Sequence, residues 1–428
     1  MTKTDLRIRV LPAIADVPAA AWDACANPMV PSPMAAIPQP NSQCPAAARP
    51  ERSDGTPKAP ARLSELPYNP FISHAFLNSL EASKSATART GWQPQHLLVE
   101  SAAGQPIGAV PCYLKSHSRG EYVFDGGWAE AYEHAGGQYY PKLQVSVPFT
   151  PATGRRLLVP PGPQAADIRA ALCAGLVEVC RLHRASSVHV TFAPEDEWRM
   201  LGERGFLQRT DQQFHWQNAG YATFEDFLDA LASRKRKAIR RERREALSPG
   251  IEVEWLSGSD LTEAVWDQFF AFYMDTGSRK WGRPYLTRAF YSMVGELMGD
   301  RVLLVMARRA GRYIAGAINF IGSDTLFGRH WGAVEHHPFL HFELCYYQAI
   351  DYAIAHRLAR VEAGAQGEHK LARGYLPVTT RSAHYVADPG LRRAIDDYLK
   401  RERAYVAAAG RELAEAAPFR KDLMVEED

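Results

Sequence analysis

The chain has 428 residues, of which 46% are hydrophobic and 11% aromatic, so it is too long for one small core and we expect two or three globular domains. Its 50 basic and 48 acidic side chains leave a net charge of +2, which excludes a global field that would attract nucleic acid or a membrane. Any such contact must therefore be local.

The hydrophobic pattern of residues 1–26 predicts the N-terminal strand and helix of a first domain, over Leu6–Leu11 and Ala19–Ala26. The next stretch, 27–62, is rich in Pro, Ala and Ser and has few large apolar residues, which indicates a disordered insertion. No stretch of the chain reaches the roughly 18 apolar residues of a membrane helix, and the N-terminus has no apolar segment followed by a cleavage site. We therefore expect neither export nor membrane insertion.

The rest of the first domain is expected over residues 63–218. Ser73 is placed to cap a helix, and Gly104 marks the turn of a β-hairpin. The predicted elements are, in order, the helix NPFISHAFLNSLE, the hairpin HLLVE to PIGAVPCYLK, the strand EYVFDGGW, the long loop YYPKLQVSVPFTPATGRRLLV, the helix Asp167–Arg184 and the strand SSVHVTF.

Residues 219–250 predict a basic linking helix, which carries eight Lys or Arg between positions 234 and 244. Phe224, Phe227 and Ile239 contribute to one apolar edge, so an inter-domain helix with a solvated basic face explains the pattern. The alternative is a contact between 233–247 and the phosphates of tRNA or of a nucleotide-linked acceptor.

Residues 251–428 repeat the first domain, and a C-terminal helix ends the chain. Four windows agree in the same order, which indicates two copies of one unit. The pairs are PFISHAFLNSL with PYLTRAFYSMV, LLVESAAGQPIGAV with LLVMARRAGRYIAGAI, EYVFDGGW with TLFGRHW, and LCAGLVEVCRLHRASSVHV with LCYYQAIDYAIAHRLARVEAG.

The order helix, hairpin, strand, helix, strand is that of the GNAT acyltransferase fold, so we predict an α/β (α+β) chain of tandem GNAT-like domains, each a twisted mixed sheet flanked by helices. In this fold the strands before and after the central helix splay apart and accept an acyl donor. In the second copy these strands are TLFGRHWGA and ARVEAGAQG. The second copy is therefore expected to hold the catalytic cleft, and the first to select the acceptor.

The segment GAQGEHKLARGY, residues 364–375, ends the strand that lines this cleft. A strand-to-helix turn needs glycine whatever its function, because glycine accepts positive φ. The turn alone does not explain the polar side chains that the segment also carries. The equivalent point of the first copy, HVTFAPEDEW, has no such glycine turn.

Long blocks of the chain, between about residues 63 and 406, resemble the FemAB-like peptidoglycan biosynthesis/recognition family of bacterial GNAT-fold proteins. The resemblance implies a relative of the Fem aminoacyltransferases, which transfer an aminoacyl group from aminoacyl-tRNA to the amine of a cell-wall precursor. The blocks are HSRGEYVFDGGWAEAYEHAG, YYPKLQVSVPFTPATGRRLLV, QFHWQN, SRKRKAIRRERREA, LHFELCYYQAIDYAI and EAGAQGEHKLARGYLPVTTRSAHY.

The acyl donor is expected to be an acyl-CoA or an aminoacyl-tRNA, and no other cofactor is implied. The segment GAVEHHPFLHFE before the central helix of the second copy lacks the R/Q-x-x-G-x-G/A turn that binds pyrophosphate in acetyl-CoA users. The sequence therefore leaves the choice between the two donors open.

Three residues are predicted to be catalytic. Glu343 begins the central helix among apolar neighbours that would raise its pKa for use as a base, although the helix dipole alone explains a carboxylate there. His369 titrates near neutral pH and serves as base or donor, or as a structural hydrogen-bonding residue. Tyr375 lies where GNAT-fold enzymes often keep a tyrosine acid, although a single tyrosine is more often a core residue.

A further set is predicted to bind the donor or the substrate. Lys370 and Arg373, three residues apart, can face one anion, or they form a solvated face. The other members lie on the cleft strand, in the glycine turn and in or beside the long loop of the first copy: Arg329, His330, Trp331, Gln366, Gly367, Lys142 and Arg155.

We therefore predict an N-acyltransferase that acts on an amine, with a peptidoglycan precursor as one acceptor. The alternative is a non-catalytic module that uses the same cleft to hold a cell-wall precursor or RNA. A metal hydrolase built on Glu335, His336 and His337 is the weakest hypothesis, since no HExxH spacing is present and no metal is expected. The six cysteines form no CxxC pair, which indicates a reducing cytoplasm.

Overall fold

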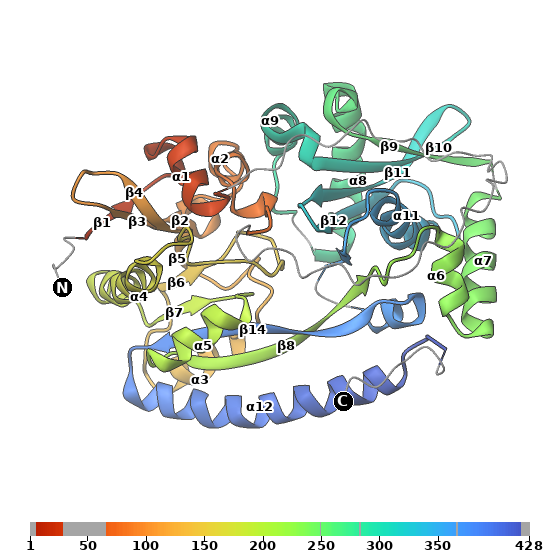
Figure 1. Cartoon of the computed structure of the whole chain (residues 1–428). Coiled ribbons are helices and arrows are strands. Elements are labelled where there is room, and N and C mark those ends of the chain that lie inside the picture. The colour runs from red at the N-terminus through yellow and green to blue at the C-terminus, as the bar shows by residue number, and fades with distance from the viewer. Residues whose placement is uncertain (1–5, 29–65, 249, 282–283, 365–366, 421–428) are drawn as a thin grey trace.

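The computed structural model describes residues 6–28, 66–248, 250–281, 284–364 and 367–420. Most of the expected Pro/Ala-rich insertion, from residue 29 to 62, therefore lies outside the described residues. One broad, twisted sheet runs through the whole molecule, and helices cover both of its faces (Figure 1).

The first half of the chain alternates short strands with helices. Its elements are β1 (Arg7–Leu11), α1 (Ala19–Ala26), α2 (His74–Ala82), β2 (Trp92–Pro94), β3 (His96–Glu100), β4 (Pro106–Val110), β5 (Cys112–Lys115), α3 (Gly126–His134), β6 (Lys142–Val145), α4 (Ala165–Leu182), β7 (Ser187–Val190), α5 (Glu195–Glu203) and β8 (Leu207–Gln217).

The second half begins with two helices that connect it to the first. Its elements are α6 (Phe224–Ala230), α7 (Ser233–Leu247), β9 (Ile251–Leu256), α8 (Glu263–Trp281), α9 (Arg288–Met298), β10 (Val302–Arg309), β11 (Arg312–Ile321), β12 (Thr325–Ala333), α10 (Leu340–Phe342), a π-helical turn (Glu343–Tyr347), α11 (Gln348–Ala355), β13 (Arg360–Glu362), the 3-10 helix η7 (Glu368–Arg373), β14 (Leu376–Val386) and α12 (Pro389–Glu415).

The large sheet has the order β2-β5-β6-β7-β14-β8-β13-β12-β11-β10-β9, and β1, β3 and β4 form a separate sheet. Two parallel pairs, β6 with β7 and β12 with β13, interrupt its otherwise antiparallel ladders. Each parallel pair flanks a crossover helix, α4 in the first half and α11 in the second. This arrangement confirms the predicted α/β fold of tandem GNAT-like units.

The two halves exchange their last long strands. β8 comes from the first half but pairs with β13 of the second, whereas β14 comes from the second half and pairs with β7 of the first. β8 and β14 also pair with each other, from Leu376 opposite His215 to His384 opposite Leu207. The sheet is therefore continuous across the boundary between the halves, and α12 covers both exchanged strands (Figure 1).

Two details of the predicted elements are wrong. EYVFDGGW is not a strand: residues 121–125 form a loop, and Trp128 lies on α3. The polar groups of Glu121 and Asp125 bind a buried lysine instead of flanking a sheet ladder, and β6 takes the position that TLFGRHW has in the second half. PIGAVPCYLK forms two strands rather than one, because Pro111 has no N–H to continue the ladder and the chain passes there from the small sheet to the large one.

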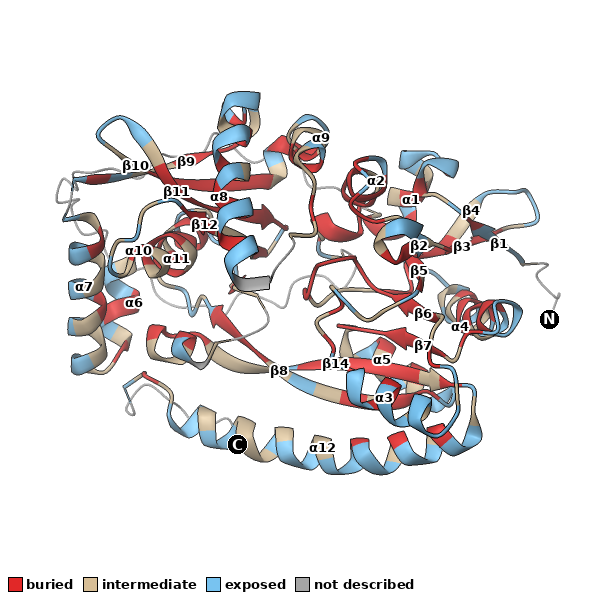
Figure 2. Ribbon diagram, turned by 180° about the vertical axis from the view of Figure 1, so that it is seen from behind, coloured by how far each residue is buried: buried red, intermediate tan, exposed pale blue. Residues whose placement is uncertain are grey.

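One apolar core extends across both halves. Phe76 of α2 is buried, and its ring contacts Phe290 of α9 and Phe320 of β11 edge-on, with centroids 5.7 and 5.2 Å apart. Exposed residues concentrate on the outer faces of α7 and α12 (Figure 2). Among the described residues, no helix is both long and apolar enough to cross a bilayer.

Because the halves share this core and one sheet, they are expected to unfold together. Phe76→Ala should lower the free energy of unfolding by about 3–5 kcal/mol, through lost burial and the cavity that remains. Calorimetry should show a single transition at a lower midpoint. Leu297→Ala, at a position 48% exposed, is the control and should change little. Two separate transitions in the wild type would contradict the shared core.

Candidate functional site

The strands β12 and β13 part soon after they meet. They pair in parallel only from Thr325 opposite Arg360 to Phe327 opposite Glu362, and β12 then continues against β11 alone. A register shift on β11 leaves Arg329 as the extra residue of a bulge in β12. A bulge bends the strand and redirects a side chain, so the wedge opens at Glu362 with Arg329 on its other wall.

Glu362 is buried at the apex of this wedge. Burial raises the pKa of its carboxyl to about 8, although Arg360 and Arg329 oppose the shift, so the group is mostly protonated at neutral pH. Its Oε1 lies 4.0 Å from Nδ1 of His215 on β8. Its Oε2 has no hydrogen-bond partner within the described part of the chain. A buried carboxyl with a raised pKa and a spare oxygen is a typical acid–base group.

The tautomer of His215 follows from its neighbours. Gln213 donates its Nε2–H to the carbonyl of Pro151 at 2.8 Å, so its Oε1 accepts from Nε2 of His215 at 3.1 Å. Nδ1 therefore carries the free lone pair that faces Glu362. Burial lowers the pKa of His215 to about 3, which keeps the ring neutral.

A loop of the first half closes this wedge. Arg329 donates to the carbonyl of Phe149, and the Tyr122 side chain is a second hydrogen-bonding partner of the guanidinium. The ring of Phe149 stacks on Tyr285 with centroids 4.8 Å apart. Tyr122 and Phe149 both adopt positive φ, near 60°, which is unusual for aromatic residues and typical of positions held by their surroundings.

Two cavities flank the wedge. One, of about 520 Å³, lies beyond the end of β12, and the other, of about 340 Å³, lies over the centre of β8 and β14. The first is lined by residues that include Asp275, Arg279, Trp331, Glu335, His336, His337, His341 and Phe342. The second is lined by Tyr122, Phe124, Phe192, Asp211, Gln212, Gln213, Phe214, Gly367, Thr380 and Leu413. We name them the β12 cavity and the central cavity.

The structure gathers several of the predicted site residues around Phe342 and Tyr346. His369 bonds the Tyr346 hydroxyl through Nε2 at 2.8 Å, and the guanidinium of Arg373 lies 3.4 Å from the centre of the Phe342 ring. Tyr375 is fully buried and donates to the carbonyl of Tyr346 at 3.3 Å. This cluster borders the β12 cavity through Phe342.

The carboxylate of Glu343 does not have the apolar setting that the sequence predicts. Arg243 of α7 donates to both of its oxygens, at 3.1 and 2.9 Å, and Gln348 donates to one of them at 2.8 Å. Arg243 also binds Asp351. The apolar side chains of this turn surround the ion pair, so the geometry indicates a structural carboxylate that fixes α7 against the π-helical turn.

Lys370 and Arg373 do not share one anion. Lys370 is buried and donates to the carbonyl of Gly364 at 3.0 Å, and burial lowers its pKa to about 8. Arg373 is paired with Glu242 of α7 at 2.9 Å. Gly367 has φ of 121°, a backbone conformation that side chains rarely adopt. Gln366 lies outside the described residues.

His330 and Trp331 follow the bulge on β12. Burial lowers the pKa of His330 to about 3, and its ring packs edge-on against Tyr273 with centroids 5.1 Å apart. Trp331 packs against His341 at 5.0 Å and lines the β12 cavity. Among the predicted binding residues, Trp331 therefore lines the β12 cavity, whereas Gly367 lines the central cavity.

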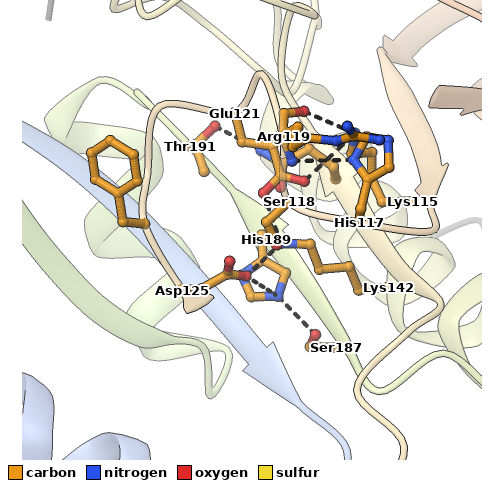
Figure 3. Close-up of polar contacts among 12 residues, drawn as sticks. Lys115, His117, Ser118, Arg119, Glu121, Asp125, Lys142, Ser187, His189 and Thr191 are labelled. Atoms are coloured by element: carbon orange, nitrogen blue, oxygen red, sulfur yellow. Dashed lines mark hydrogen bonds and ion pairs between the residues drawn. The ribbon is translucent and has the colours of Figure 1, made fainter. Parts of the chain in front are cut away.

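Lys142, predicted to bind substrate, is instead buried in a cluster of charges (Figure 3). Its Nζ contacts Ser118 at 2.8 Å, Glu121 at 2.7 Å and Asp125 at a short distance. These three residues belong to the loop that carries Tyr122, so Lys142 holds this loop in place. Arg155 likewise donates to backbone carbonyls, among them that of Val159 at 3.2 Å.

The residues suggested as a metal site form an ion-pair group instead. Glu335 contacts Arg309 at 2.7 Å and His337 at 2.9 Å, and His336 lines the β12 cavity beside them. Among the described residues, no group of three or more His, Cys, Asp or Glu side chains has an arrangement that could hold a metal ion.

Sequence reasoning missed Glu362, His215, Gln213 and Tyr122. Glu362 lies within the predicted cleft strand ARVEAGAQG and is the last residue of β13, so its position could have identified it. His215 and Gln213 lie in the block QFHWQN and reach the wedge only because β8 crosses into the second half. No local pattern predicts that exchange.

The fold defines a tandem GNAT-like chain in which β12 and β13 part beyond Glu362. The chain belongs to the FemAB-like family, described as peptidoglycan biosynthesis/recognition, whose model matches residues 54–421. No curated protein matches the chain significantly.

Solved structures are similar to the chain at low sequence identity. FemX is 12% identical, covers 74% of this chain and 93% of its own, and has a TM-score of 0.48. A tandem GNAT protein from the clavulanic acid biosynthesis pathway is 14% identical over 90% of this chain and 99% of its own, with a TM-score of 0.43. The C-terminal domain of a putative lysylphosphatidylglycerol synthetase from Agrobacterium fabrum is 9% identical over 75% and 96%, with a TM-score of 0.46. These likenesses are loose, and the fold class follows from the strand order.

The raised pKa of Glu362 predicts a pH dependence of stability. In the folded state the Glu362 carboxyl keeps its proton up to pH about 8, whereas in the unfolded chain it releases the proton near pH 4.5. The stabilisation from this proton is therefore complete below pH 4.5 and is lost as the pH rises through about 8. Glu362→Gln removes this loss. The melting temperature of the variant, minus that of the wild type, should therefore increase between pH 5.5 and 9.

Thermal unfolding followed by circular dichroism at the two pH values measures this difference. Glu412→Gln, at an exposed position of α12, is the control and should melt in parallel with the wild type at both. Parallel behaviour of Glu362→Gln would show that the carboxyl is not perturbed by burial.

Proposed function

We propose that the chain is an N-acyltransferase that transfers an acyl or aminoacyl group to an amine, with a peptidoglycan precursor as acceptor, in the wedge between β12 and β13. The observation that carries this proposal is the pair Glu362 and His215. It places a carboxyl with a spare oxygen and a neutral imidazole lone pair at the apex of an opening between two strands. Family membership supports the precursor as the acceptor class.

Attack by an amine requires loss of its ammonium proton and stabilisation of the negative charge that develops on the carbonyl oxygen. In this proposal the ionised Glu362 takes the ammonium proton, and the protonated carboxyl then passes a proton to the leaving oxygen or sulfur of the acyl donor. The Nδ1 lone pair of His215, 4.0 Å from Oε1, faces this carboxyl and favours its protonated form. Arg329, on the opposite wall, supplies positive charge for the developing oxyanion. The mostly protonated state of Glu362 at neutral pH predicts a rate that increases toward pH 8.

The two cavities are assigned to the two substrates. The β12 cavity, with Trp331 and Phe342 on its walls, receives the acyl donor, and the central cavity receives the acceptor amine. Phe339, at the start of α10, has φ of 62° and lines the β12 cavity, where CoA-dependent enzymes place a glycine turn. This favours aminoacyl-tRNA over acyl-CoA as the donor.

Purified protein is to be assayed with acyl-CoA and with aminoacyl-tRNA as donors and a peptidoglycan precursor peptide as acceptor. Glu362→Gln should lower kcat by about 10²–10⁴ if it removes general base catalysis, and should abolish the increase in rate toward pH 8. Glu197→Gln is the matched control. Glu197 is also a buried carboxyl with a pKa raised to about 7, but it accepts from the backbone amides of Arg156 and Leu157, outside the wedge.

Turnover that is equal in Glu362→Gln and the wild type would refute the assigned site. Saturable binding of the precursor without turnover of either donor would instead support the alternative hypothesis, in which the chain is a non-catalytic recognition module.

Contact with tRNA is proposed for one stripe of α7. Arg234, Lys237 and Arg244 are exposed, and among the described residues no ion-pair partner is present for them, whereas Arg236 and Arg240 are paired with Asp229 and Glu225. Replacing the three with alanine should weaken tRNA binding and reduce the slope of log K against log salt by about 2–3. Arg236→Ala is the control and should change the slope less. Binding that is insensitive to salt would remove this contact.

A further inference from the structure

An apolar groove lies between α3 and α12, and none of its lining residues belongs to β12 or β13. Its volume is about 310 Å³, which corresponds to roughly ten water-sized groups. The residues that line it are Phe124, Gly127, Trp128, Ala131, Leu391, Ala394, Ile395 and Tyr398. None of these side chains is charged, and the phenol of Tyr398 is bonded to Glu402.

The most exposed wall of the groove is Phe124, whose residue is 67% exposed. Its backbone is fixed on both sides. Arg209 donates to its carbonyl at 2.8 Å, and the next residue, Asp125, is bound to Lys142. The Phe124 ring is therefore held in an exposed position at the edge of the groove.

The opposite wall is equally well supported. The Trp128 ring has the guanidinium of Arg209 5.0 Å from its centre, the ring of His384 at 5.1 Å and the ring of Tyr398 at 6.2 Å. Gly127 leaves space at the floor, because a Cβ placed there would meet no atom within 4 Å. The groove therefore holds its shape and has room for a guest.

Phe124 connects this groove with the proposed acceptor site. The same residue lines the central cavity, together with Tyr122 and Gln213. Tyr122 contacts Arg329 and Gln213 contacts His215, so the central cavity adjoins the wedge. A ligand whose polar end occupies the central cavity can pass Phe124 and continue into the groove without leaving the surface.

We infer that the groove binds an aliphatic chain carried by the acceptor, with the amine of the same molecule in the central cavity. This inference rests on the proposed function for the identity of the acceptor, but binding of the chain itself is independent of turnover. The chemistry follows from the lining: only an apolar chain gains from contact with these side chains, and the volume sets its length at about ten carbons.

Primary alkylamines from butylamine to dodecylamine, below their micellar concentrations, are the probes. Calorimetric titration of the full chain should show an affinity that rises with length, up to about fourfold for each methylene that is fully buried, and that levels off near ten carbons. Trp128 fluorescence should change with the same dependence, because its ring forms the groove wall.

Two variants test the location. Ala394→Trp fills the groove from an exposed position of α12 and should abolish the dependence on chain length while butylamine binding is kept. Phe124→Ser removes the outer wall of the groove and should also abolish the dependence on chain length; because Phe124 lines the central cavity as well, it should weaken butylamine binding too. Ala404→Trp, also exposed on α12 but outside the groove lining, is the matched control and should behave like the wild type.

Affinity that does not change with chain length, or that changes equally in Ala394→Trp and Ala404→Trp, would overturn the inference. So would self-association of the wild type that Phe124→Ser abolishes, because the groove would then be a contact between two copies. Chain-length-dependent binding without acylation of any amine would support the groove and count against the proposed function, so the two failures are distinguishable.

Discussion

The antiparallel pairing of β8 with β14 is the constraint on which the rest of the structure depends. Each of these strands leaves its own half. β8 therefore pairs with β13 of the second half, and β14 pairs with β7 of the first half. The far side of β13 is free to part from β12 after Glu362. The other side of β13 is thus held by a strand of a different repeat, and His215 reaches Glu362 only through this exchange.

The buried charges of the molecule fall into two groups with different consequences. Lys142, Arg243 and Arg373 are each bonded to carboxylates of another element, and such pairs fix loops and helices in place. Glu362 is buried with one carboxyl oxygen that has no hydrogen-bond partner among the described residues. Burial raises the pKa of Glu362 and lowers that of His215, so both shifts favour the neutral form of the group. A buried polar group without a full set of hydrogen bonds lowers the stability of the fold. Buried titratable groups with shifted pKa values are typical of sites that catalyse proton transfer.

The sequence predicts the repeated unit, the fold class and the strands that form the wedge, because hydrophobic periodicity and a long resemblance both depend on local patterns. It fails where tertiary pairing decides the outcome. EYVFDGGW has the composition of a strand, but Glu121 and Asp125 bind Lys142 and the chain turns into α3. Glu343 has apolar neighbours in sequence, yet its partner Arg243 comes from α7, and no spacing in the sequence reveals that contact.

The two halves share a topology, and the loop after β6 packs against the parallel strand pair of each half. In the first half this loop returns to the end of β7: Arg156 is buried there and donates to the carbonyls of Thr191 and Ala152 at 2.9 and 2.7 Å. The same loop reaches the second half, where the Phe149 carbonyl binds Arg329. One loop thus packs against the end of β7 in the first half and against Arg329 of β12 in the second.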